Sequence, residues 1–218
     1  MTDIDTAPDG FARRRMQSQE EIRRAARRLF SQFGVERVSV QDIARKANVS
    51  HGTIYNNFGS KDTLVREYVA EMIEQLEEQT LAVLTPEMPF QEKMVALAAF
   101  FTSNAQWSNL AGGRNPVFGA SADLLNDPDI RKMREAAQER LIELLLDVVA
   151  QGKREGAVKP SLSEAALRIY FKLYMEAFTD PALVHQLRSD PEILRDLGKL
   201  MLRGLTLEPV AGAALSNH

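Results

Sequence analysis

Residues 39–61 read SVQDIARKANVSHGTIYNNFGSK. Ser39, Ser50 and Ser60 each precede a helical pattern, and serine is a preferred N-cap because its hydroxyl accepts a hydrogen bond from a free amide of the first turn. Asn48 lies between the first two patterns, and asparagine tolerates the left-handed conformation of a tight turn. The stretch therefore predicts a short helix, a tight turn, a second short helix and the start of a longer one.

The second short helix has an unusual outward face. At 100° per residue, Ile54 and Phe58 point inward. The outward residues are short or hydrogen-bonding: Gly52, Thr53, Tyr55 and Asn56. A face that meets only solvent usually carries Lys and Glu, whereas short polar groups beside a glycine suit a helix pressed against base edges and phosphates. The alternative for Tyr55 is a half-buried supporting role.

The charge of the chain is unevenly distributed. Residues 11–62 contain eleven Lys and Arg against five acids, a net charge of +6, whereas residues 63–218 carry −6. A basic segment joined to an acidic remainder is expected when one segment contacts a polyanion. The alternative is a solvated basic face on the first helix. That helix is predicted from an apolar stripe that ends before Gly34 and consists of Ile22, Ala25, Ala26, Leu29, Phe30 and Phe33.

A short helix, a tight turn and a second helix in a basic region form a helix-turn-helix candidate. Thr53 suits a thymine methyl or a phosphate, Asn56 an adenine edge, and Tyr55 a phosphate or sugar. Lys61 can pair with a phosphate at a helix N-terminus, and Arg13 to Arg15 are expected to lie as an arm along an adjacent groove. The full set of candidate DNA-binding residues is Ser39, Gln41, Arg45, Ser50, His51, Gly52, Thr53, Tyr55, Asn56, Asn57 and Lys61.

Over about 45 residues the chain resembles the N-terminal signature of the TetR family of bacterial transcriptional repressors. The matching residues are Ala25-Ala26, Leu29-Phe30, Gly34, Ser39-Val40, Asp42-Ile43-Ala44, Ala47, Val49-Ser50, Gly52-Thr53-Ile54-Tyr55, Phe58 and Ser60-Lys61. The chain departs at Asn48 and Asn57, where the family often has Gly and His. The resemblance implies a three-helix DNA-binding domain, a linking fourth helix, and a larger helical domain that dimerises and binds a small effector.

The remainder of the chain also has helical patterns, so the predicted fold class is all-α: an N-terminal three-helix helix-turn-helix domain and a larger C-terminal helical ligand-binding and dimerisation domain. Asp127-Pro128 and Asp190-Pro191 each predict a helix start, with an acidic N-cap and proline at the first helical position. The expected domains are a flexible arm over 1–12, the DNA-binding domain over 13–60, the effector and dimerisation domain over 61–208, and a flexible tail over 209–218.

A helix predicted over 162–178 is apolar on two flanks, and one core cannot use both. A second subunit is the expected partner of the other flank, and the family resemblance likewise implies that the last two helices pair across a twofold. The alternative is a central helix of a monomeric bundle. The predicted dimer-interface residues are Leu167, Phe171, Met175, Phe178, Leu197, Met201 and Leu205.

The effector pocket is expected among aromatic residues of the C-terminal part, with a few polar anchors. The candidate ligand-binding residues are Phe100, Phe101, Asn104, Trp107, Arg114, Phe118, Tyr170 and Tyr174. The alternative for each aromatic residue is a place in the core. An apolar lining would suit a largely apolar effector.

The sequence does not favour an enzyme. It contains no cysteine, and its three histidines are scattered without a metal-binding, nucleophile-elbow or Walker pattern. We therefore expect no catalytic residues, no metal and no cofactor. The acidic N-terminus lacks the features of a secretory signal and the apolar runs are too short to span a membrane, so a cytoplasmic protein with no membrane partner is expected. An architectural, effector-independent DNA-binding protein is the main alternative.

Overall fold

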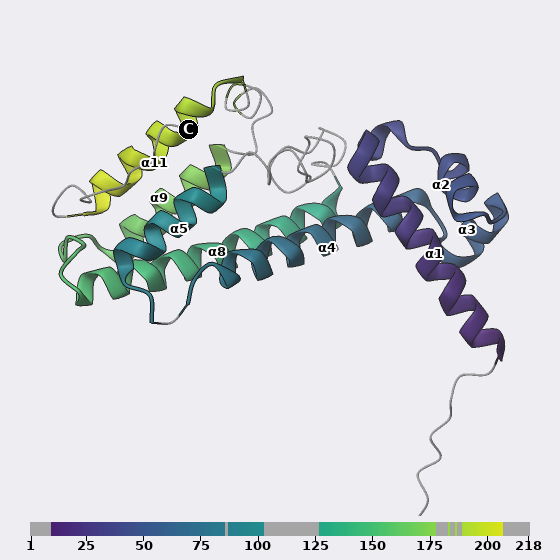
Figure 1. Ribbon diagram of the computed structural model, residues 1–218, viewed down its shortest axis with the longest axis horizontal. Coiled ribbons are helices and arrows are strands. Elements are labelled where there is room, and N and C mark those ends of the chain that lie inside the picture. The colour runs from purple at the N-terminus through teal and green to yellow at the C-terminus, as the bar shows by residue number, and fades with distance from the viewer. Residues whose placement is uncertain are drawn as a thin grey trace, which may run out of the picture. The chain divides into compact units, whose positions relative to one another are not determined.

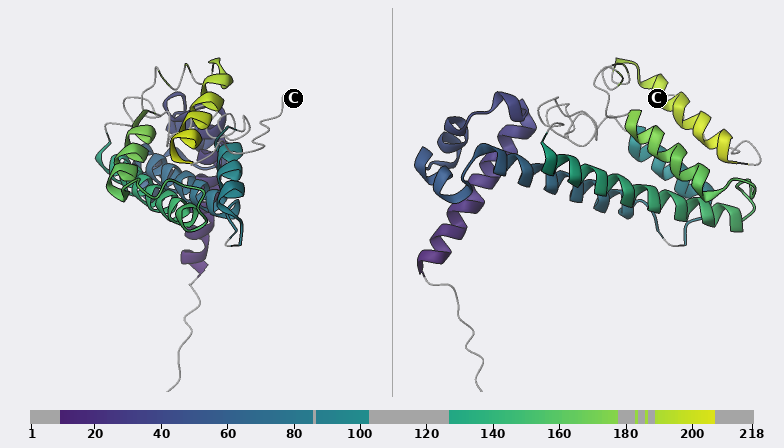
Figure 2. Two further views of the ribbon diagram at one scale, coloured as in Figure 1. Left: turned by 90° about the vertical axis from the view of Figure 1, so that its left-hand side faces the viewer. Right: turned by 180° about the vertical axis from the view of Figure 1, so that it is seen from behind.

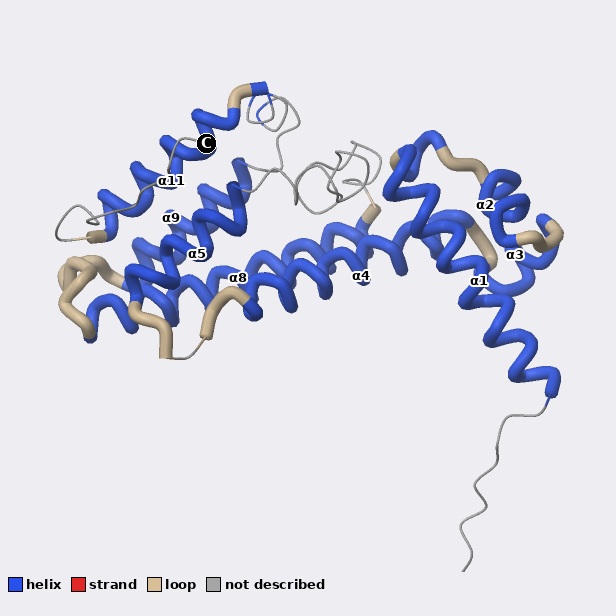
Figure 3. Tube along the Cα trace, in the orientation of Figure 1, coloured by secondary structure: helices blue, strands red, loops and turns tan. Residues whose placement is uncertain are grey.

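The computed structural model describes residues 10–85, 87–102, 127–177, 183, 186 and 189–206. Helices dominate this part of the chain (Figures 1 and 3). The one β-type contact in it is an isolated bridge between Val158 and Thr206. The predicted all-α class is confirmed. The helices are α1 (Gly10–Phe33), α2 (Val40–Ala47), α3 (His51–Phe58), α4 (Lys61–Ala82), α5 (Phe90–Thr102), α8 (Pro128–Arg154), α9 (Glu164–Ala177) and α11 (Pro191–Leu205), with a 3₁₀ turn at Val35–Arg37.

The chain divides into two compact units, Met1–Val69 and Ala70–His218. The division falls inside α4, nine residues after the start of the effector domain expected from the sequence. No helix in the described ranges is long and apolar enough to cross a membrane.

In the first unit, α1 packs against both α2 and α3. The core is aliphatic and aromatic, and its fully buried side chains include Ile22, Phe30, Ile43 and Ile54. Phe33, predicted in the same stripe, is instead 48% exposed, because it is the last residue of α1 and the chain turns away after it. The helix begins at Gly10, so Arg13 to Arg15, which the sequence analysis expected to lie as an arm along a groove, are part of α1.

The helix starts and stops in this unit follow the predicted capping chemistry. Ser39 and Asp42 form a complete capping box, in which the Asp42 amide donates to Ser39 Oγ at 3.2 Å and the Ser39 amide donates to Asp42 Oδ2 at 3.0 Å. Asn48 ends α2 with φ of 54°, in the left-handed region. Ser50 and Ser60 accept hydrogen bonds from the amides three residues later. Local hydrogen bonding thus fixes the turn between α2 and α3.

In the second unit, α5 packs on α8 and α11, and α8 packs on α9 (Figure 2). One apolar cluster joins these helices, and its most buried members are Phe90, Val158 and Ile142. Predicted acidic caps are present where the structure describes them. The Asp127 side chain accepts hydrogen bonds from two amides in the first turn of α8. The Asp190 side chain accepts a hydrogen bond from one amide in the first turn of α11.

Polar contacts hold the start of α5 against the end of α8. The Phe90 amide donates to Glu155 Oε2 at 2.9 Å, and Lys93 Nζ donates to Gln151 Oε1 at 2.7 Å. Hydrogen bonds that Glu155 accepts from the Gln151 side chain and the Phe90 amide hold the pKa of the Glu155 carboxyl below its usual range. The charges of Lys93 and Arg154 make smaller contributions in the same direction. Gly152 lies beside Phe90, and a Cβ atom built on it would approach Phe90 Cδ2 to 2.6 Å.

The burial of α9 corrects the predicted dimer interface. Leu167, Phe171 and Met175 are 4%, 2% and 7% exposed and belong to the core of this same chain. Ile169 and Leu173, on the other flank, are each 61% exposed. The flank that the sequence analysis gave to a partner is therefore packed in the core of its own chain, against α8.

The predicted interface residues of α11 divide in a similar way. Leu205 is 3% exposed and packs in the core of its own chain, and Met201 packs partly buried against that core. Leu197 is half-buried, whereas Leu200 is 65% exposed. Phe178 lies outside the described residues.

Candidate nucleic-acid interface

Two buried side chains fix the orientation of α3. Ile54 and Phe58 are 0% and 7% exposed, and they anchor α3 in the core of the first unit. The opposite face is open, with Gly52, Tyr55 and Asn56 exposed. The inward and outward faces predicted from the sequence are therefore correct for Ile54 and Phe58 and for these three outward residues.

The hydroxyl and amide groups along α3 are not equally available to a partner. Ser50 Oγ accepts from the Thr53 amide at 3.1 Å and lies 2.8 Å from Thr53 Oγ1. Asn57 Nδ2 donates to the Thr53 carbonyl at 2.8 Å, so this amide is used inside the helix. The Tyr55 ring stacks at a tilt on His51, with 4.8 Å between ring centroids, and Tyr55 remains 45% exposed. The side chains most free to meet a partner are those of Tyr55 and Asn56.

Glycine at position 52 is not required by the packing of this chain. A Cβ atom built there would meet only Ser50 Oγ, at 3.8 Å, which is an ordinary contact. Glycine in a helix costs about 0.5–1 kcal/mol relative to alanine. The open space beside Gly52 therefore lies on the outside of the molecule, where an external surface could approach the backbone of α3.

The N-terminus of α3 carries an uncompensated positive end. Its first turn contains no acidic residue, whereas the first turn of α2 contains Asp42. Hydrogen bonds from Ser39, and the charge of Arg45, hold the pKa of the Asp42 carboxyl below its usual range, so Asp42 is a carboxylate that offsets the dipole of α2. The free amides at the start of α3 are suited to a phosphate.

Polar and basic side chains surround α3. Gln41 is exposed on α2, and the Arg45 side chain is 79% exposed, with a loose contact to Asp42 at 3.4 Å. Lys61 is half-buried in the first turn of α4. Ser39 is half-buried, and its hydroxyl is engaged with Asp42, which leaves it a capping role in this structure.

Sequence reasoning missed the part that Arg23 plays in supporting this surface. Arg23 Nε, on α1, donates to Glu67 Oε2 on α4 at 2.9 Å, and its guanidinium lies 5.2 Å from the centroid of the Phe58 ring on α3. The hydrogen bond to Glu67 raises the pKa of Arg23. Its partners lie 35 and 44 residues away along the chain, so no local pattern could have revealed them.

The model of the bacterial regulatory proteins of the TetR family matches residues 22–68, which include all of α2 and α3 and the second half of α1. The chain belongs to the TetR family. It is a DNA-binding transcriptional regulator, and its helix-turn-helix consists of α2 and α3.

Two curated relatives and one solved structure extend the similarity beyond the matched segment. The chain is 25% identical to the HTH-type transcriptional regulator YhgD of Bacillus subtilis, over 73% of this chain and 81% of that protein. It is 22% identical to the HTH-type transcriptional repressor KstR2 of Mycolicibacterium smegmatis, over 66% and 68% of the two chains. A regulator from Saccharomonospora viridis in complex with choline has the same fold, with a TM-score of 0.68, 17% identity, and coverage of 88% and 100%.

The predicted ligand-binding residues do not gather at one described site. Phe100 is 6% exposed in the core, whereas Tyr170 is 41% exposed. Tyr174 is half-buried, and burial, with a smaller contribution from Tyr170, raises its pKa to about 12. The side chain of Phe101 and residues Asn104, Trp107, Arg114 and Phe118 lie outside the described part of the chain.

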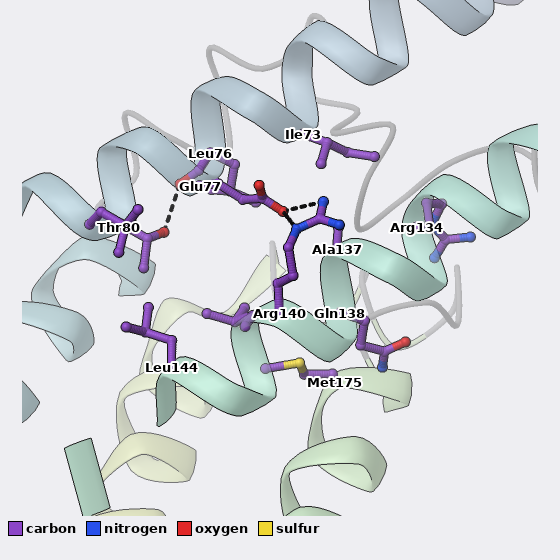
Figure 4. A pocket seen from close by; sticks show the side chains of 12 residues that line it. Ile73, Leu76, Glu77, Thr80, Arg134, Ala137, Gln138, Arg140, Leu144 and Met175 are labelled. Atoms are coloured by element: carbon purple, nitrogen blue, oxygen red, sulfur yellow. Dashed lines mark hydrogen bonds and ion pairs between the residues drawn. The ribbon is translucent and has the colours of Figure 1, made fainter. Parts of the chain in front are cut away.

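A pocket of about 160 Å³ lies elsewhere, between α4, α8 and Met175 of α9 (Figure 4). None of the predicted ligand-binding residues lines it. The sequence signal that could have indicated it is the apolar face of α4, which continues through Ile73 and Leu76 beyond the first unit.

Proposed function

We propose that this regulator is a repressor that binds a palindromic operator as a homodimer and is released by a small effector. The observation that carries the proposal is the outward face of α3, where Gly52, Tyr55 and Asn56 are exposed on a helix anchored by Ile54 and Phe58. A rigid helix with short polar side chains can enter the major groove and place those groups against base edges. The description of KstR2 as a repressor supports the direction of regulation.

Each group at this surface then has a distinct task. Asn56 pairs with an adenine edge, and Tyr55 donates its hydroxyl to a phosphate beside the groove. The free amides at the start of α3 bind a further phosphate. Arg45 and Lys61 contact the phosphate backbone, which contributes affinity but no sequence preference.

A second copy of the chain is the proposed partner of the exposed flank of α9. Ile169, Tyr170 and Leu173 are 61%, 41% and 61% exposed, and Leu200 of α11 is 65% exposed. Large apolar side chains gathered on one helix face are typical of a protein interface. A twofold dimer would carry two copies of α3, which can enter successive major grooves when they are separated by roughly 34–36 Å.

An effector in the second unit would act by favouring a conformation of the dimer that cannot bind the operator. α4 is the natural transmitter, because it begins at Lys61 beside the DNA-binding surface and continues to Ala82. The choline bound to the Saccharomonospora viridis regulator supports a small-molecule effector in general, without indicating which one.

Operator binding is tested by fluorescence anisotropy with the upstream DNA of the regulator's own gene and a scrambled duplex, at one fixed salt concentration. We expect the upstream duplex to bind at least about 10³-fold more tightly, as is usual for specific sites. Tyr55→Ala should weaken this complex, and the matched variant Tyr55→Phe separates loss of the hydroxyl from loss of the ring. Equal affinities for the two duplexes would refute the repressor proposal and favour an architectural DNA-binding protein.

Dimerisation is tested by sedimentation velocity on Leu173→Glu. Leu173 is 61% exposed, so the substitution spares the core of the chain and introduces a charge into the proposed interface. The matched control is Val95→Glu, on α5, where the native side chain is 41% exposed. We expect monomers for Leu173→Glu and wild-type dimers for the control. A dimer that survives Leu173→Glu would place the interface elsewhere.

A further inference from the structure

The pocket between α4 and α8 has mostly apolar walls. Its volume is about 160 Å³, and its apolar lining consists of Ile73, Leu76 and Leu81 of α4, Ala137, Leu141 and Leu144 of α8, and Met175 of α9. A cavity of roughly 150 Å³ with such a lining admits a molecule the size of benzene. The dimensions therefore fit a single ring or a short branched chain.

A buried hydrogen-bond donor without a partner belongs to this lining. Gln138 Nε2 is buried and donates to no acceptor in the described structure. Such a donor costs free energy, and a ligand that supplies an acceptor removes that cost. The last torsion of a glutamine side chain has a broad preference, so a small turn of the amide brings the donor toward the pocket. Gln138 accordingly calls for an acceptor atom on the bound molecule.

The charged groups of the described lining are already engaged within the chain. They are Glu77, Arg134 and Arg140. Arg140 directs two nitrogens at one carboxylate oxygen, because its Nε donates to Glu77 Oε1 at 2.8 Å and its Nη2 lies 2.6 Å from the same atom (Figure 4). Arg134 also has an interaction partner in the structure. A charged ligand would therefore lose its hydration in this apolar pocket without gaining an unpaired opposite charge.

The hydrogen-bonding groups of the lining indicate which neutral ligand fits best. Thr80 Oγ1 donates to the Leu76 carbonyl at 2.7 Å, so its single proton is already used. Gln138 is then the described lining residue whose donor needs an acceptor. A carbonyl oxygen supplies that acceptor without adding a proton that would need an acceptor of its own, as a hydroxyl or amine would.

We propose that this pocket binds a small neutral carbonyl compound, such as a ketone or lactone, whose oxygen accepts from Gln138 Nε2 and whose hydrocarbon part lies between α4 and α8. The assignment rests on the proposed function for its regulatory meaning, since the bound compound would be the effector. Five lining residues belong to α4, so the compound contacts the helix that begins in the DNA-binding unit. Binding favours the arrangement of α4 and α8 that best encloses the compound.

The test uses two neutral probes of nearly the same shape, cyclohexanone and methylenecyclohexane, in which a C=CH₂ group replaces the carbonyl. Each is titrated into the full-length protein with isotope-labelled methionine methyl groups, and the nuclear magnetic resonance signal of Met175 reports occupancy of the pocket. That signal is identified by its loss in Met175→Leu. We expect cyclohexanone to shift it at millimolar concentrations, and cyclohexylammonium and cyclohexanecarboxylate to leave it unchanged. A stronger response to either ion than to cyclohexanone would overturn the proposal.

The hydrogen bond itself is measured as a coupling between the carbonyl oxygen and Gln138. Gln138→Met removes the donor and keeps a similar shape, so cyclohexanone affinity should fall at least about fivefold while methylenecyclohexane affinity changes less than about twofold. The matched control, Gln91→Met, changes an exposed glutamine of α5 and should leave both affinities unaltered. Equal changes for the two probes in Gln138→Met would overturn the assignment.

The stability of the same variant is a second, independent test. Gln138→Met should be at least as stable as the wild type in urea unfolding, because an apolar group replaces a buried donor that has no partner. A clear loss of stability in both Gln138→Met and Gln138→Leu would show that the amide is satisfied within the chain, and would overturn the proposal. If only Gln138→Met fails to fold, Gln138→Leu takes its place in the titrations with the same expectations.

Adding cyclohexanone to the operator complex separates the two proposals. Release of DNA from the wild type but not from Gln138→Met supports both. Cyclohexanone binding that depends on Gln138 but leaves the DNA complex intact supports the carbonyl site and contradicts release through this pocket. Absence of coupling to Gln138, with specific operator binding retained, overturns the carbonyl site and leaves the DNA-binding proposal standing.

Discussion

The substitution Gly52→Ala separates the folding of α3 from its proposed contact with DNA. The added Cβ atom would lie 3.8 Å from Ser50 Oγ and would meet no other atom within 4 Å. The isolated protein should therefore be unchanged or slightly more stable, by about 0.5 kcal/mol, since alanine favours a helix over glycine. If the backbone at Gly52 lies against DNA, the same methyl group overpacks that contact and costs about 1–3 kcal/mol. Operator affinity should then fall about 5- to 150-fold.

Two measurements on the same preparation test the stability and the operator affinity of Gly52→Ala. Urea unfolding followed by circular dichroism gives the stability, and fluorescence anisotropy with the upstream duplex gives the affinity at fixed salt. The matched control is Gly198→Ala in α11, where an added Cβ atom also meets nothing within 4 Å. We expect wild-type operator affinity for the control. Wild-type operator affinity for Gly52→Ala, with an intact fold, would show that α3 does not approach DNA at this residue.

Three further substitutions test the second unit. Gly152→Ala should lower the unfolding free energy by about 1–2 kcal/mol, because a Cβ atom there would lie 2.6 Å from Val158 Cγ2 and this overpacking exceeds the gain in helix propensity. Urea unfolding measures the change, with Gly198→Ala as the control variant. A Gly152→Ala protein more stable than the wild type would contradict the prediction. The Glu155 pKa is lowered from 4.5, so its contribution to stability is present above that pH and is lost as the pH falls through the folded-state pKa. As the pH is lowered from 5 to about 3, the melting temperature of Glu155→Gln should therefore fall less than that of the wild type. The Tyr174 pKa is raised from 10.0 to about 12, so its contribution to folding stability is present below pH 10 and is lost as the pH rises toward 12. Tyr174→Phe should therefore remove the tyrosine ionisation near pH 12 from the ultraviolet titration.

Local chemistry explains why the first unit could be predicted from the sequence. The capping box at Ser39, the left-handed Asn48 and the cap at Ser50 each depend on residues within five positions of one another. Such interactions leave a direct trace in the sequence. The inward and outward faces of α3 follow from helical periodicity once those caps define its start.

The dimer face could not be assigned in the same way. The two apolar flanks of α9 have similar composition, with Leu167 and Phe171 on one and Ile169 and Leu173 on the other. Only the packing of α8 against α9 determines which flank is buried, and that contact is not encoded by local spacing. Periodicity therefore predicts that a helix has two apolar flanks, but tertiary structure decides which of them remains for a partner.

The pocket escaped prediction for a related reason. Aromatic residues drew attention in the sequence, but Phe100 lies in the core, where it is 6% exposed. The described pocket is instead built from aliphatic side chains of α4 and α8, together with Gln138 and Arg134, which have no distinctive spacing. What marks Gln138 is the missing hydrogen-bond partner, a property of the folded chain alone.

Arg23 connects the start of α4 to the end of α3. Its guanidinium bonds to Glu67 on α4 and lies over the ring of Phe58, the last residue of α3. Phe58 is also 7% exposed in the core, so α3 cannot turn independently of the side chains packed around it. A planar guanidinium makes both contacts at once, whereas a lysine ammonium could not maintain the same fork and stacking. The Arg23 side chain thus joins the first turns of α4 to α1 and α3 within the first unit.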